Sequence, residues 1–166
     1  SGAQYRQLMA AASGRIHADE YGKTTVLSVY LDTPDRRLIR ASLDKPAYKE
    51  KLRVRSYGVP TAADTVFVEL KKKYCGVVYK RRVSLPLREA RAWLLEGRYA
   101  PGGQIDREID YVLHYYPSLA PAMLISAERV AYVGMDDPFL RLTFDSRILY
   151  RREALLLEAG AWGEAL

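Results

Sequence analysis

The sequence has few of the residues that build disulfides or metal centres, with one cysteine and two histidines among 166 residues. A single thiol cannot form a disulfide within the chain, so nothing here indicates an oxidising compartment. His17 and His114 lie far apart and lack the spacing of metal ligands. Cys75 has no histidine or carboxylate pattern nearby that would make it a catalytic nucleophile. These absences argue against a disulfide scaffold, a zinc centre and cysteine catalysis.

Long apolar runs are also missing. No segment approaches the roughly 20 residues that a membrane helix needs, and no signal peptide opens the chain. We therefore expect a soluble, cytoplasmic protein without a membrane segment. The composition is 49% hydrophobic, which is enough for a core, and the length fits one domain. The net charge of +6 favours an anionic partner, which could be a nucleic acid, an acidic membrane surface or a phosphate compound.

The apolar pattern predicts an α+β fold with long, mainly antiparallel strands. Helices are expected over 4–13, from Thr33 to about Leu43, between Pro86 and Gly97, and from Ile105 to Pro117. The first of these is expected to end at Gly14, and a loop is expected over 98–103. The segment Thr33-Pro34-Asp35 predicts a helix start, with a hydroxyl cap, a proline at the first position and an acid in the first turn. Strands are expected over 24–32, 48–57, 65–75, 77–84, 123–133 and 139–148, and Leu155–Leu157 is an ambiguous strand candidate.

Three successive predicted strands each have one mainly basic face. Residues two apart on a strand point to the same side. This alternation groups basic side chains in each strand, namely Lys49, Lys51, Arg53 and Arg55, then Lys71 and Lys73, then Lys80 and Arg82. If the apolar faces pack against helices, the basic faces lie together on the other side of the sheet. For any single strand a solvated face is the simpler interpretation. Three together indicate an anion site, because like charges placed opposite each other otherwise destabilise a sheet.

The later strands extend this pattern. Arg141, Thr143 and Asp145 alternate with Leu140, Leu142 and Phe144. On its side of the predicted strand, Arg129 lies between Ala127 and Ala131, whose small side chains leave room for a ligand. Arginine forks suit phosphate oxygens, and lysine supplies compact positive charge.

Two carboxylates, Glu69 and Asp145, share the basic faces. They either balance the neighbouring cations or hold a divalent cation such as Mg²⁺ or Mn²⁺ for phosphoryl transfer.

Several segments, taken together, resemble the VTC domain. They occur in the expected order and cover most of the chain, from about 24 to 150: SVYLDTP at 28–34, YKEKLRVRSYG at 48–58, VFVELK at 66–71, VYKRR at 78–82, REIDY at 107–111, ERVAY at 128–132 and LRLTFD at 140–145. Each motif alone is weak evidence for this family, but the complete set in this order is specific to it.

The resemblance implies the triphosphate tunnel fold, an antiparallel β-barrel lined with basic side chains. It also implies an ATP-dependent polyphosphate polymerase that transfers the terminal phosphate of ATP to a polyphosphate chain and uses Mn²⁺ or Mg²⁺. By motif position the catalytic group is Lys51, Arg53, Arg55 and Lys71. Arg129, Arg141 and either Lys80 or Arg82 resemble further phosphate-binding residues of the family, and strand alternation allows both of the latter. Strand alternation alone adds Lys73 as a phosphate-binding candidate and Glu69 and Asp145 as the candidate metal ligands.

The chain departs from the family pattern at both ends. The first basic strand and the last strand, whose glutamate binds metal in the family, are not found. We therefore expect one partial tunnel domain over 1–166, with an open barrel and with flanking helices. Whether this chain is active alone stays open. An open barrel exposes strand edges, which favours pairing with a second copy.

Three alternatives remain. The chain could be a non-catalytic polyphosphate-binding or regulatory module, or a hydrolase of inorganic or organic triphosphates. Nucleic-acid binding is disfavoured, because the basic faces contain few aromatic residues beyond Tyr57 on which bases could stack.

Overall fold

The computed structural model describes residues 2–44, 46–98 and 102–166, and the predicted loop at 98–103 lies partly outside them. In this part a seven-stranded antiparallel sheet has the order β4-β3-β2-β1-β5-β6-β7. The elements are α1 (Gly2–Ala11), β1 (Ile16–Asp32), α2 (Arg37–Leu43), β2 (Tyr48–Tyr57), β3 (Thr65–Tyr74), β4 (Val77–Pro86), α3 (Leu87–Glu96), α4 (Gln104–Tyr115), β5 (Ala120–Gly134), β6 (Arg141–Arg151), the 3₁₀ helix η1 (Leu157–Ala159) and β7 (Glu164–Ala165). The predicted α+β class with antiparallel strands is confirmed.

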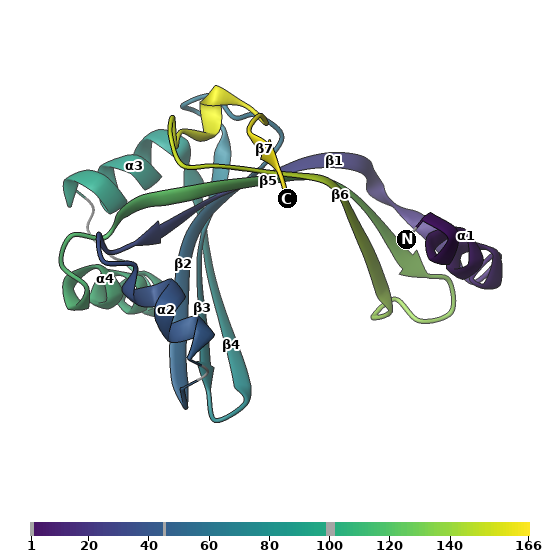
Figure 1. Ribbon diagram of the computed structural model, residues 1–166, viewed down its shortest axis with the longest axis horizontal. Coiled ribbons are helices and arrows are strands. Elements are labelled where there is room, and N and C mark those ends of the chain that lie inside the picture. Colours follow the sequence, from purple (N-terminus) through teal and green to yellow (C-terminus); the bar gives the residue numbers. More distant parts are fainter. Residues whose placement is uncertain (1, 45, 99–101) are drawn as a thin grey trace.

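The sheet bends into an open arch rather than a closed barrel (Figure 1). Strands β2, β3 and β4 form one limb, and β1, β5 and β6 curve away from them into the other. Within the described residues, β4 pairs only with β3, so its outer edge is free along the arch opening. Pairing of this edge with a second copy of the chain stays a prediction.

The hydrophobic core lies on the outer side of the arch, where α3 and α4 cover the sheet (Figure 1). Alternate apolar residues of β1, β2 and β3, such as Leu27, Leu52 and Val68, are fully buried there. They pack with Trp93 of α3 and Ile109 of α4 in one cluster. Because these strands bury one face, the opposite face carries their polar and charged side chains.

Helix α2 begins later than the sequence predicts, at Arg37 rather than at Pro34. The Asp32 carboxylate accepts hydrogen bonds from the backbone N–H groups of Leu38 and Ile39, at 2.9 and 3.1 Å. Thr33 Oγ1 accepts one from the N–H of Arg37 at 2.9 Å. These two side chains satisfy the first turn from outside the helix, so residues 33–36 form a turn before it.

Strand β1 is longer than expected, because it begins at Ile16 rather than at 24. Its early part pairs only with β5, and a register shift separates Ala18 from Lys23. Side chains there are mostly exposed, so the alternation that marks a half-buried strand is missing. Helix α1 packs at this end, where the Tyr5 ring meets Phe144 edge-on at 4.8 Å.

The ambiguous strand candidate at Leu155–Leu157 does not form a strand. Leu157 instead begins η1, and the short strand β7 follows. Arg151, only 4% exposed, explains this fold. Its guanidinium donates hydrogen bonds to four backbone carbonyl oxygens, those of Ala154, Leu156, Gly160 and Trp162, at 2.7 to 3.1 Å. The segment therefore wraps around the arginine instead of extending.

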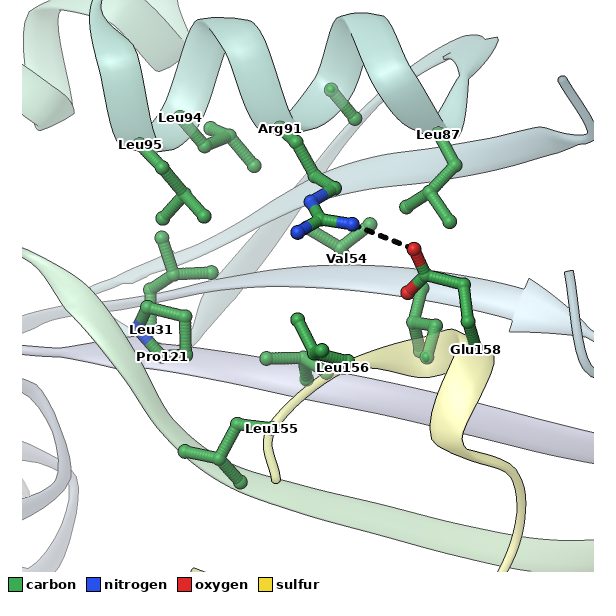
Figure 2. Close-up of a pocket in the computed structure, with 13 residues that line it drawn as sticks. Leu31, Val54, Leu87, Arg91, Leu94, Leu95, Pro121, Leu155, Leu156 and Glu158 are labelled. Carbon is green, nitrogen blue, oxygen red and sulfur yellow. Dashed lines mark hydrogen bonds and ion pairs between the residues drawn. The ribbon is translucent and has the colours of Figure 1, made fainter. Parts of the chain in front are cut away.

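An apolar pocket of about 50 Å³ lies between α3 and this wrapped segment (Figure 2). Leucines of α3 face Leu155 and Leu156 across it, and Arg91 forms an ion pair with Glu158 at 2.7 Å. Its lining is otherwise aliphatic, which is unsuitable for phosphate, so the pocket is a gap in core packing.

In the part of the chain described, no helix has the length and apolarity to cross a bilayer.

Candidate anion-binding face

Strand register places the basic side chains of β2, β3 and β4 side by side. Residues that face each other across neighbouring strands point to the same side of the sheet. Between β2 and β3, Lys49 lies opposite Lys73, Lys51 opposite Lys71, and Arg53 opposite Glu69. Between β3 and β4, Lys71 lies opposite Lys80 and Glu69 opposite Arg82. The predicted common basic face of these three strands is therefore present.

The other limb adds to the same face. Thr24 of β1 pairs with Arg129 of β5, which pairs with Asp145 of β6. Arg141 lies opposite Val133, four pairs further along. All side chains proposed from the sequence thus share this face, which we call the concave face: Lys51, Arg53, Arg55, Lys71, Lys73, Lys80, Arg82, Arg129, Arg141, Glu69 and Asp145.

Hollows line the concave face. One of them, about 400 Å³, is bounded by Arg82 on one limb and by Arg129 and Arg141 on the other. This shared boundary shows that the two limbs face each other. A second hollow, about 330 Å³, is lined by four lysines, Lys49, Lys51, Lys71 and Lys73. A third, about 210 Å³, lies between α2 and the sheet.

Several arginines of the concave face, together with Lys80, are paired with the two carboxylates Glu69 and Asp145. Glu69, at the middle of β3, is 2% exposed. Arg53 Nε and Arg82 Nε each donate to a different carboxylate oxygen of Glu69, both at 2.7 Å. Burial opposes ionisation of Glu69, but the hydrogen bonds and charges of Arg82 and Arg53 outweigh it and lower its pKa to about 2.

Arg129 and Asp145 form a second pair, with two parallel hydrogen bonds at 2.7 and 2.8 Å. The hydrogen bonds from Arg129 lower the pKa of Asp145, although burial opposes this. The same pairing raises the pKa of Arg129. Both groups therefore stay charged and fixed.

The lysine part is not neutralised. Lys51, Lys71 and Lys73 form no ion pair within 4.0 Å in the part of the chain that the structure describes. Lys71 lies between Lys51 and Lys80, so it has a like charge on both neighbouring strands. Because such pairs are unfavourable, this part is the strongest electrostatic argument for a bound anion.

The two carboxylates do not fit a divalent cation. Both oxygens of Glu69 are engaged by guanidinium groups, and Lys80 and Arg55 lie 3.5 and 3.9 Å away. Both oxygens of Asp145 are engaged by Arg129. No cluster of three or more metal-ligating side chains occurs in the described ranges. A cation at Glu69 would meet four positive charges, so we assign no metal-dependent step to either residue.

Sequence reasoning missed the residues that hold these arginines. The Tyr30 hydroxyl accepts a hydrogen bond from Arg53 Nη1 at 2.8 Å, and Ser28 Oγ accepts one from Arg55 Nε at 3.1 Å. The Arg82 guanidinium lies over the Phe67 ring at 4.5 Å. Alternation in β1 places Ser28 and Tyr30 on the concave face, so that signal was available.

An open antiparallel arch with basic side chains inside, and with α3 and α4 outside, defines an open form of the tunnel-type fold. A family model of the VTC domain matches residues 3–165, and the chain belongs to the VTC domain family. This confirms the resemblance seen in the sequence.

Among solved structures, a crystal structure from Bacillus halodurans, provisionally described as an adenylate cyclase, is similar with a TM-score of 0.52. The similarity covers 88% of this chain and 75% of that chain at 15% identity, which supports the fold alone. No curated protein matches the sequence.

Proposed function

We propose that this domain binds ATP and polyphosphate along the concave face and transfers the terminal phosphate of ATP to a polyphosphate chain. The observation that carries the proposal is the single face shared by basic side chains from β2, β3, β4, β5 and β6. Membership of the VTC domain family supports triphosphate or polyphosphate chemistry on this face. Transfer of phosphate to a polyphosphate chain is a more specific proposal than binding of phosphate compounds on this face.

The basic side chains can support transfer without a covalent enzyme intermediate. Lys51, Arg53, Arg55 and Lys71 are the proposed catalytic group, which would stabilise the charge spread over the transferred phosphoryl group. The other five, Lys73, Lys80, Arg82, Arg129 and Arg141, would hold the flanking phosphates in line. A terminal oxygen of the polyphosphate chain attacks the γ-phosphorus of ATP, the bond to the β-phosphate oxygen breaks, and ADP leaves.

Metal dependence is general among tunnel enzymes, and Mg²⁺ or Mn²⁺ would arrive with ATP. The residues proposed as metal ligands are engaged by arginines, so the structure supports no ligand role for them. This favours a second candidate function, a non-catalytic module that binds polyphosphate without turnover.

The test is to incubate the wild-type protein with ATP and either Mn²⁺ or Mg²⁺ and to measure polyphosphate. Calorimetric titration with tripolyphosphate, and with single-stranded DNA at the same salt concentration, measures binding separately. Chain growth supports the polymerase. Binding without product rejects it in favour of the module, and release of inorganic phosphate without chain growth indicates a triphosphatase. Stronger binding of DNA than of tripolyphosphate would contradict the whole proposal.

A further inference from the structure

Glu69 is an unexpected residue at the centre of a surface proposed to bind phosphate, because its negative charge repels the ligand. It is nonetheless 2% exposed and lies on β3 between the two arginines that flank it in register, Arg53 on β2 and Arg82 on β4. An anion so deeply placed either only balances charge or organises its neighbours.

The contacts favour organisation. Arg53 approaches Oε2 of Glu69 with both Nε and Nη2, at 2.7 and 2.6 Å. Arg82 approaches Oε1 with its own Nε and Nη2. Each carboxylate oxygen therefore accepts from the Nε–Nη2 edge of one guanidinium, and the arrangement is nearly symmetric.

Each guanidinium also contacts a tyrosine hydroxyl, Arg53 through Nη1 and Arg82 through Nη2, the nitrogen that also donates to Glu69. Tyr30 accepts a hydrogen bond from Arg53 Nη1 at 2.8 Å, and Tyr57 lies 3.5 Å from Arg82 Nη2. The Cζ atom of Arg82 lies over the Phe67 ring, 4.5 Å from the ring centroid. A guanidinium has five N–H donors, so Arg53 keeps N–H groups on both Nη atoms for a ligand. Its orientation, however, is already set.

We propose that Glu69 is a positioning residue, which fixes the guanidinium groups of Arg53 and Arg82 in the orientation that receives a phosphate chain. The inference rests on the proposed function of the concave face. An arginine side chain that is already ordered loses less conformational entropy when it binds, and this gain exceeds the repulsion between Glu69 and the phosphate.

Glu69→Gln separates the two roles by the sign of its effect. The variant keeps the shape and one acceptor oxygen, and it removes one negative charge from the face. A residue that only balanced charge would give tighter tripolyphosphate binding when neutralised. A positioning residue gives weaker binding, roughly tenfold, which corresponds to the loss of one charged hydrogen bond.

Two further variants control the comparison. Glu108→Gln makes the same charge change on the opposite face, where Glu108 pairs with Lys72 and Arg81, each at 3.1 Å. It should bind tripolyphosphate as the wild type does or slightly more tightly. Glu69→Asp keeps the charge but withdraws the carboxylate, and it should also weaken binding. Wild-type affinity in Glu69→Asp would overturn the inference, as would tighter or unchanged binding in Glu69→Gln.

A measurement on the wild-type protein applies even where a Glu69 variant does not fold. With ¹⁵N-labelled arginine, the Nε–H signals of Arg53 and Arg82 should be visible and protected from solvent exchange before any phosphate is added. Signals that become protected only after tripolyphosphate is added would overturn the inference. If the wild type itself does not bind tripolyphosphate, the proposed function fails instead.

Discussion

Replacing Lys71 by glutamine should make the protein more stable and at the same time a weaker phosphate binder. Lys71 lies directly opposite Lys51 on one side and Lys80 on the other, and it forms no ion pair in the described part of the chain. Glutamine keeps a long polar side chain and removes the charge. Both halves of the prediction follow from that single change.

The magnitude comes from the two like-charge pairs that the substitution removes. Cross-strand charge pairs are worth roughly 0.2–1 kcal/mol each, so the free energy of unfolding should rise by about 1 kcal/mol at low salt. For a chain of this size that corresponds to about 2–4 °C in Tm. The gain should shrink at high salt, because exposed charges are screened. Tripolyphosphate binding should weaken by about 1.5 kcal/mol, or about tenfold in Kd.

Lys72→Gln is the matched control, because it removes the same charge from the neighbouring position on the opposite face. Lys72 forms an ion pair with Glu108 at 3.1 Å. The control should therefore lose stability and should bind tripolyphosphate with nearly wild-type affinity. Thermal unfolding in phosphate-free buffer and calorimetric titration measure both quantities. A lower Tm for Lys71→Gln, or an unchanged Kd, would refute the assignment of the lysines to an anion site.

Two other predictions concern charged groups whose partners the structure defines. The pKa of Glu69 is lowered from 4.5 to about 2, so its ion pairs stabilise the fold above pH 4.5, and this stabilisation is lost as the pH falls toward 2. Consequently the stability difference between the wild type and Glu69→Gln, measured by urea unfolding, should shrink over that range, and a constant difference would contradict it. Arg151→Ala should cost about 3 kcal/mol or more, because four backbone carbonyls lose a charged donor. Urea unfolding followed by tryptophan fluorescence measures this cost, and a loss below 1 kcal/mol would show that the C-terminal segment holds without it.

The common basic face was predictable because side-chain alternation is a local property. Once 48–57, 66–75 and 77–85 are strands with one apolar face, the direction of every lysine and arginine in them follows. The exact partners needed the register. Between β3 and β4 the register follows from the turn, since Cys75 and Gly76 both have positive φ, 45° and 89°, as the type I′ turn of a two-residue hairpin requires. That turn places Tyr74 opposite Val77 and therefore Glu69 opposite Arg82.

Other features could not be predicted from local pattern. The longer connection between β2 and β3 sets no register, so the alignment of Arg53 with Glu69 depends on packing of the whole sheet. The early part of β1 lacks alternation because only β5 supports it. The 3₁₀ helix at Leu157 depends on contacts with Arg151, which lie outside any local window.

On the concave face most arginines are paired with carboxylates and most lysines are not, and this difference connects stability with function. Arg53, Arg82 and Arg129 are partly buried and cannot be left unpaired at low cost, so Glu69 and Asp145 accompany them and fix their geometry. Lys51, Lys71 and Lys73 reach water, where an unpaired charge costs little solvation, and no carboxylate of the described residues forms an ion pair with them. An anionic chain along the concave face would therefore find oriented donors at the arginines and unneutralised charge at the lysines. Orientation favours specific contacts with phosphate oxygens, and unneutralised charge favours affinity that falls with salt. A face built only for solubility would need neither the buried carboxylate nor the like-charge pairs.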